Sequence, residues 1–178
     1  RYLVASSGSA TTPIFLPNHF DIRTIRWIIG SQSLGGIVAG PLEITGNVNL
    51  SMGTSNARDV FLQRDLTLSG ILSGASGHGM RMNGGGVIQL TNPANTFTDG
   101  VSWNASGIRL EVFSNGSLGN PANTLNFAAS GTLLATESFT SPRSVVIAAG
   151  KHAKLGAGES KTLSLSGIIS GGSADAAS

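Results

Sequence analysis

Apolar residues recur two positions apart along most of the chain, in short runs bounded by glycine, asparagine, serine or proline. Ile108, Leu110 and Val112 form one such run, with Arg109 and Glu111 alternating between them. This spacing is typical of β-strands, whose alternate side chains lie on one face. With 25 glycines in the chain, no long helix is expected, and residues 18–29, the one helix candidate, are interpreted as strand. We predict an all-β fold.

The chain also repeats itself. RDLTLSGILSGAS at 64–76 matches KTLSLSGIISGGS at 161–173, and NPANT occurs at 92–96 and again at 120–124. Self-similarity of this kind indicates stacked units, each too thin to fold alone. Short strands, tight Gly and Asn corners and repeats together predict a parallel β-solenoid.

Solenoid coils of about 20–25 residues would divide the chain into roughly seven to nine coils, a rod about 35–45 Å long at ~4.8 Å per strand. Glycines should occupy corners with positive φ, and Asn should adopt a left-handed conformation there or hydrogen-bond its own backbone. We assign 20–178 to one domain with two related units, about 33–76 and 130–173. Residues 1–19 match no repeat and are interpreted as an assembly or capping arm with apolar residues Tyr2, Leu3, Val4, Ile14, Phe15 and Leu16.

Composition limits the possible partners. Charged residues are 11% of the 178-residue chain, against roughly 25% in a typical soluble domain. Eleven Lys and Arg stand against nine acids, mostly scattered singly, so no basic stripe for nucleic acid is expected. No apolar run approaches the ~18 residues of a membrane span. The chain lacks cysteine, which favours a bacterial surface protein or a cytosolic one, and a start at Arg1 indicates a processed product or a fragment.

Two motifs could suggest small-ligand chemistry. GAGESKT at 156–162 is similar to a phosphate-binding loop but lacks the glycine before the lysine, so we interpret it as a coil corner. His19, His78 and His152 stand far apart without a second ligand at metal-binding spacing, so exposed loop positions are favoured. His78 belongs to a Gly-rich segment, 77–86, which we interpret as a loop that could carry function. No cofactor or metal is expected.

Acids and aromatic residues leave two further possibilities open. Asp59 and Asp65, flanked by Arg58 and Arg64, are the closest acid pair and could belong to a polysaccharide-cleaving site, although alternating charge on an outer strand face explains them equally. A sugar-stacking platform could use Trp27, Trp103, Tyr2 and Phe113. Both tryptophans alternate with aliphatic neighbours and are predicted to be core, whereas Phe113 interrupts the alternation and is predicted to be exposed.

VIQLTNPANTFTDGVSWNASGIRLEV (87–112), with SNGSLGN (114–120) and ASGTLLATESFTS (129–141), resembles the autotransporter-associated β-strand repeat, also called the passenger-associated transport repeat. The likeness covers 60–173 well and 20–59 more loosely. Phe97 replaces the family's usual Tyr, Asp99 replaces a Gly, and GHGMRMNGGG (77–86) stands where the family has a Lys. The motif positions, which specify geometry and no catalysis, are filled here by Asn95, Thr96, Phe97, Thr98, Gly100, Asn104 and Gly107.

The resemblance implies a right-handed β-helical stalk of a secreted or surface-located bacterial protein. We therefore expect a non-enzymatic stalk or self-assembling fibre subunit, whose partners are other copies of itself or adjoining coils of a longer passenger. Assembly would run end to end, or through the 1–19 arm adding a strand to a neighbour. An adhesin that binds a host protein or glycan through an outer face or the 77–86 loop is the alternative, and a polysaccharide-active enzyme is the second alternative.

Overall fold

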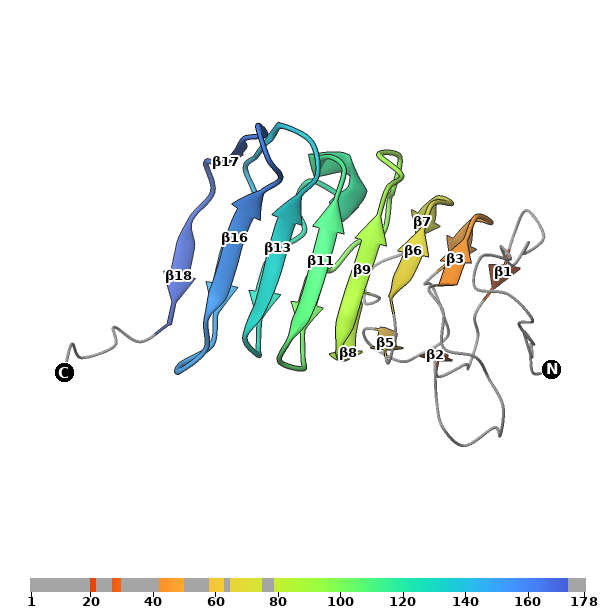
Figure 1. Ribbon diagram of the computed structural model, residues 1–178, viewed down its shortest axis with the longest axis horizontal. Helices are drawn as coiled ribbons and strands as arrows, with labels where there is room; N and C mark the ends of the chain where they lie inside the picture. Colours follow the sequence, from red (N-terminus) through yellow and green to blue (C-terminus); the bar gives the residue numbers. More distant parts are fainter. Residues whose placement is uncertain are drawn as a thin grey trace.

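The computed structural model describes residues 20–21, 27–29, 42–49, 58–62, 65–74 and 79–172. These form a β-solenoid of about five turns, built from parallel strands and one short 3₁₀ helix. Figure 1 shows the strands stacked side by side along the long axis, in the order of the chain. The expected all-β solenoid class is confirmed, while the range of seven to nine coils stays a prediction.

Two large sheets form two of the three faces. The six-stranded sheet has the order β16 (Ala153–Ala157), β13 (Gly131–Ala135), β11 (Ile108–Val112), β9 (Gly86–Leu90), β6 (Leu66–Leu68) and β3 (Leu42–Ile44). The seven-stranded sheet has the order β18 (Ile169–Gly171), β15 (Val145–Ile147), β12 (Leu125–Phe127), β10 (Val101–Trp103), β8 (Met80–Gly84), β5 (Arg58–Leu62) and β2 (Trp27–Ile29). Successive coils add their strands side by side to these two sheets.

The third face is less regular. At one end it has β1 (Phe20–Asp21), β4 (Val48–Asn49) and β7 (Leu72–Ser73), and at the other β14 (Phe139–Ser141) pairs with β17 (Leu163–Leu165). Between them run the segment 91–98 and the 3₁₀ helix η1 (Asn115–Leu118). We call this surface the third face throughout.

The register repeats with a period of 20 to 24 residues from β5 onward. Leu66 pairs with Ile88, Trp103 with Phe127, and Phe127 with Ile147. Coils therefore differ in length, and the differences are absorbed at corners, while inward positions stay aligned. This alignment places like residues above one another in a narrow interior.

The interior is a series of apolar columns. Along the six-stranded sheet, the buried column contains Leu66, Ile88, Leu110 and Leu133. Along the seven-stranded sheet, the Trp103 indole stacks on the Phe127 ring with centroids 4.0 Å apart. Trp103 is fully buried, as predicted, although its Nε1 donates to no acceptor among the described residues. Burial of these apolar columns is the main favourable contribution to the free energy of folding of such a narrow solenoid.

The two matching segments, 64–76 and 161–173, lie on different faces of the solenoid. LTL at 66–68 is β6 of the six-stranded sheet, whereas the matching LSL at 163–165 is β17 on the third face. Both are followed by a Ser-Gly corner packed against the preceding coil. A Cβ on Gly70 would lie 2.1 Å from the Gly46 carbonyl oxygen, and one on Gly167 would lie 2.1 Å from that of Arg143. The repeated unit is thus a strand, corner and strand, and not a whole coil.

One expectation about local structure is wrong, and a second is confirmed only in part. Residues 77–86 were expected to form a loop, but 80–84 are strand β8, because Met80 and Met82 alternate inward and are buried. Residues 77 and 78 lie outside the described residues. Asn was expected in left-handed corners, but among described non-glycine residues only Asp99 (φ 65°) and Ser160 (φ 59°) have positive φ. The expected hydrogen bond of Asn to its own backbone is confirmed, because Asn92 and Asn120 accept from the N–H two residues later, at Ala94 and Ala122.

Candidate functional site

Asn95, Thr96 and Phe97 lie on the third face, where successive coils meet, and Asn95 connects three of these coils. Its Oδ1 accepts from the Leu72 N–H at 2.8 Å, and its Nδ2 donates to the Ser117 carbonyl at 2.8 Å. Asn95 is buried. Its amide takes the place of backbone hydrogen bonds between strands, which the irregular third face lacks here. Buried backbone groups need such a partner.

Asn123, in the second NPANT copy, has the same kind of role. Its Nδ2 donates to the carbonyls of Phe97, at 2.9 Å, and Leu118, at 3.0 Å, and the side chain is buried. The Phe97 ring is fully buried in the core, while Thr96 points outward and its N–H donates to the Leu72 carbonyl at 2.8 Å. The two copies therefore share an Asn-Pro turn followed by a buried amide that joins coils.

Thr98, Asp99 and Gly100 form the corner that leads into β10. The Thr98 hydroxyl donates to Asp99 Oδ2 at 2.9 Å, and Gly100 adopts φ 87°. A Cβ on Gly79 would lie 2.4 Å from the Asp99 carbonyl oxygen, so the two coils touch backbone to backbone. Positive φ and close approach together explain the glycines at this corner.

Asn104 and Gly107 form the next corner, between β10 and β11. Gly107 has φ 86°, as expected for a corner glycine. In the amide orientation that satisfies both its atoms, the Asn104 oxygen accepts from Arg81 Nε at 2.9 Å and its nitrogen donates to Ser102 Oγ at 2.7 Å. This residue therefore links β8 to β10 on the outer surface.

Arg143 is a buried cation that sequence reasoning missed. Its guanidinium donates to the carbonyls of Asn115, at 2.9 Å, and Gly119, at 2.7 Å, and also to those of Asn120 and Asn123. Nε donates to Asn115 Oδ1 at 3.0 Å. Burial lowers the pKa of Arg143 to about 10, so it remains charged at neutral pH. It holds together the 115–123 excursion by donating to four of its carbonyls.

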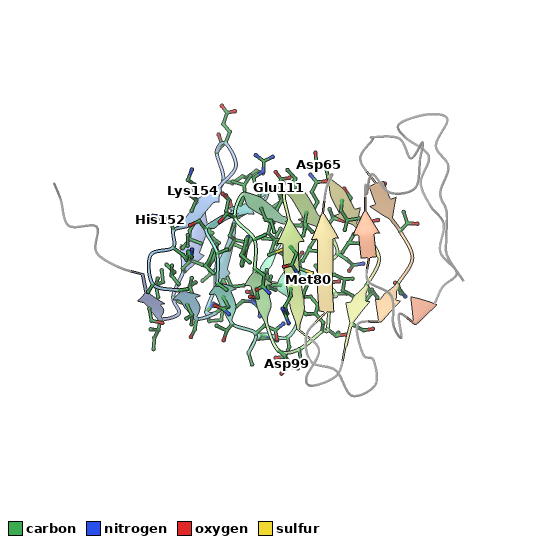
Figure 2. The ribbon with its side chains drawn as sticks, turned by 90° about the horizontal axis from the view of Figure 1, so that it is seen from below. Asp65, Met80, Asp99, Glu111, His152 and Lys154 are labelled. Atoms are coloured by element: carbon green, nitrogen blue, oxygen red, sulfur yellow. The ribbon has the colours of Figure 1, made fainter. Side chains whose placement is uncertain are left out.

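The outer surface of the six-stranded sheet carries a polar ladder along one register line. Thr67 Oγ1 donates to Gln89 Oε1 at 2.7 Å, and Gln89 Nε2 donates to Glu111 Oε2 at 2.7 Å. Arg109 pairs with Glu111 at 2.7 Å. In Figure 2, Asp65, Glu111 and Lys154 lie along one side of the molecule, and Asp99 lies on the opposite side.

The described carboxylates act mainly as connectors between coils. Glu43 Oε1 accepts from Ser69 Oγ, Asp65 Oδ1 from the Val87 N–H, and Glu137 pairs with Lys161. The side chains of Asp59 and Arg58, as well as all of Arg64, lie outside what is described, so the acid pair at 59 and 65 stays a prediction. Within the described ranges, no group of three or more His, Asp or Glu could hold a metal ion.

The other motifs and residues singled out in the sequence lie at corners, on the surface or outside the described residues. GAGESKT spans the end of β16 and, as predicted, a corner of the coil. In this corner the Lys161 N–H donates to the Gly158 carbonyl. His152 and Phe113 are exposed, the latter by 46%. His19, His78, the Trp27 side chain and the whole 1–19 arm, with Tyr2, Leu3, Val4, Ile14, Phe15 and Leu16, lie outside the described residues.

The last described coil exposes apolar residues. Ile168 is 74% exposed and Ile169 is 52% exposed. β16, β17 and β18 are terminal strands of their sheets. This end is the most apolar exposed part of the described molecule.

Comparisons with known proteins give no match: no protein-family model fits the chain, and no curated protein or solved structure is significantly similar. The described residues contain no helix that has both the length and the apolar character to cross a membrane.

Proposed function

We propose that this protein is a structural rod: a right-handed β-solenoid stalk or fibre element of a bacterial cell surface, without enzymatic activity. The observation that carries the proposal is the use of the motif side chains. Asn95, Phe97, Asn123 and Arg143 all join one coil to another or fill the interior. A chain that uses its distinctive residues to hold coils in register is suited to maintain a length and a shape.

The surface supports the same proposal. The exposed residues of the third face include small hydroxyl residues at Thr96, Thr140 and Ser164. Glu43, Glu111 and Glu137 each contact a side chain of a neighbouring coil. A wall with few charges allows stalks to lie close together, because few charges need desolvation. The likeness to the passenger-associated repeat supports a secreted or surface location.

The rod is tested by lengthening it by one coil. Gly86 is in register with Ile108, so residues 86–107 form one complete turn. A second copy of these residues, inserted directly after Gly107, should therefore keep all the apolar columns aligned. Each added copy should lengthen the particle by about 4.8 Å, measured by solution scattering. Inserting a second copy of 86–96 alone, which breaks the register, should unfold the chain.

An insertion of 86–107 that leaves the particle length unchanged, or that unfolds the protein as the partial insertion does, would contradict the rod. Location is tested separately: antibodies against the folded chain should label intact cells of the source bacterium. Labelling only after the cells are permeabilised would overturn the surface assignment and leave the rod geometry standing.

A further inference from the structure

We propose that Thr67 and Gln89 form an ester crosslink between two neighbouring coils, with Glu111 as the proton carrier. In this reaction the Thr67 hydroxyl oxygen replaces the amide nitrogen of Gln89, and ammonia is released. The reaction occurs once within the chain, so it adds no enzymatic activity, and it does not depend on the proposed rod function.

The parallel register brings the three side chains together on the outer surface of the six-stranded sheet. Thr67 on β6 is the Cα partner of Gln89 on β9, and Gln89 is the Cα partner of Glu111 on β11. Groups that are held side by side react as if they were at very high concentration, because little freedom of motion remains to be lost. The sheet therefore supplies the positioning that a weak nucleophile such as a hydroxyl needs.

The orientation of the Gln89 carboxamide follows from its two neighbours. A carboxylate only accepts hydrogen bonds, so the amide nitrogen faces Glu111, with Nε2 2.7 Å from Oε2. The carbonyl oxygen therefore faces Thr67, whose Oγ1 donates to it at 2.7 Å. The hydroxyl nucleophile, the carboxamide and a carboxylate beside the leaving nitrogen thus lie in one row.

The Glu111 carboxylate is held in place for this role. Glu111 is buried, and Arg109 Nη2 pairs with its Oε1 at 2.7 Å, which leaves Oε2 to face the amide. Thr67 and Gln89 are half-buried. A carboxylate fixed within hydrogen-bonding distance of a reacting group acts as a general base and then as a general acid.

The reaction needs no other reagent. Oγ1 of Thr67 bonds to Cδ of Gln89, and the hydroxyl proton passes to Oε1, to which it is already hydrogen-bonded. Glu111 then carries this proton from Oε1 to Nε2. The bond between Cδ and Nε2 breaks as the carbonyl re-forms, and ammonia leaves. Glu111 begins and ends as a carboxylate.

A second contact between coils shows why the amide matters. Ser69 Oγ donates to Glu43 Oε1 at 2.8 Å, but Glu43 offers a carboxylate, which has no amine to release and repels a nucleophile. No crosslink is expected there. The chain has no cysteine, so an ester at Thr67 and Gln89 gives its coils a covalent connection that disulfides do not provide. Such a connection stabilises a fold by restricting the unfolded chain.

The test is the intact mass of the purified full chain, compared with the mass calculated from its sequence. The wild type should be lighter by one ammonia molecule. Trypsin cleaves after Arg81, so Thr67 and Gln89 fall in the separate peptides 65–81 and 82–109. The crosslinked chain should instead give one branched peptide that contains both, and hydroxylamine, which cleaves esters, should separate its two parts.

Variants assign the roles. Thr67→Val keeps the shape but lacks the hydroxyl, and Glu111→Gln lacks the proton carrier, so both should retain their full calculated masses. Thr67→Ser keeps a hydroxyl and should again lose ammonia. Thr132→Val is the matched control, because Thr132 lies on the same surface between Arg109 and Lys154, with no carboxamide opposite. It should lose ammonia as the wild type does and melt at a higher temperature than Thr67→Val.

A wild-type chain that keeps its full calculated mass after prolonged incubation overturns the proposal. Loss of ammonia without the branched peptide overturns it as well, because the Asn-Gly sequences at 83–84 and 115–116 release ammonia by cyclising on their own backbone. Both results come from the wild-type chain and leave the rod standing, whereas a failed coil insertion would overturn the rod and leave the crosslink standing.

Discussion

At the scale of single residues, stability depends on a few polar side chains that bridge coils. Asn95→Ala leaves the Leu72 N–H and the Ser117 carbonyl without their partners inside the structure. We expect a loss of about 2–5 kcal/mol in the free energy of unfolding, since each buried unpaired group costs about 1–3 kcal/mol. Urea denaturation measures it.

Asn126→Ala is the matched control, because Asn126 is exposed on β12 and its loss should change the free energy of unfolding by no more than about 0.5 kcal/mol. Equal effects of the two substitutions would show that the Asn95 amide does not hold the coils together.

Arg143→Met should destabilise the fold by at least about 3 kcal/mol, because it leaves a cluster of buried carbonyls without donors. Arg109→Met, which removes a half-exposed ion pair, should cost no more than about 1 kcal/mol. Urea midpoints of both variants provide the comparison. A smaller loss in Arg143→Met than in Arg109→Met would contradict the role given to the buried guanidinium.

The Arg143 effect should also be independent of pH between 6 and 9. Burial lowers the pKa of its guanidinium from the usual value to about 10, so the group is protonated in both the folded and the unfolded chain below pH 9. Above pH 10 the unfolded chain keeps the proton more tightly than the folded chain, so this group makes unfolding less favourable as the pH rises further. A difference between wild type and Arg143→Met that changes between pH 6 and 9, followed by urea denaturation, would contradict this assignment.

The sequence predicted some of these residues and not others. The repeat motif singled out Asn95, Phe97, Gly100 and Gly107 as positions that specify geometry, because the pattern of residues is local. Arg143 could not be found in this way, because its partners lie in an excursion 20 to 28 residues earlier. No local pattern around Arg143 encodes that distance.

At the scale of elements, glycine residues allow neighbouring strands and aromatic rings to lie close to one another. A Cβ on Gly131 would lie 2.4 Å from Cδ1 of Trp103, whose ring stacks on Phe127. Gly131→Ala should therefore destabilise the protein by about 1–3 kcal/mol through overpacking, measured by the thermal midpoint together with tryptophan fluorescence.

Gly156→Ala, on the neighbouring strand β16, meets only Leu134 Cδ1 at 3.9 Å. It should be neutral or stabilising by up to about 1 kcal/mol, because it restricts the unfolded chain. If Gly131→Ala were tolerated as well as Gly156→Ala, the packing described for the Trp103 and Phe127 stack would be wrong.

Strand positions were predictable, whereas the face that each strand occupies was not. The alternation marked 108–112, which is strand β11. The face that a strand occupies depends on the number of residues in all the coils before it. Because the corners differ in length, the two matching units fall on different faces. The strand at 80–84 was missed because its glycine-rich flanks are more typical of a loop.

At the scale of the whole molecule, the account depends on parallel coils held in one register. Asn126 and Val146 test this register, because they are Cα partners on neighbouring strands β12 and β15 and both are exposed on the outer wall. The chain has no cysteine of its own, so an introduced pair reports only on its own position. Adjacent strands bring Cα atoms to about 4.8 Å, within the range of a disulfide.

The measurement is the extent of disulfide formation under mild oxidation in Asn126→Cys/Val146→Cys, read by mass spectrometry on the monomer. The control is Ser102→Cys/Val146→Cys, whose positions are two strands apart along the same register line. The solenoid predicts a complete intramolecular disulfide in the first variant, with a raised melting temperature, and almost none in the control. Absence of the disulfide in the first variant, or equal cross-linking in both, would contradict the stacked register.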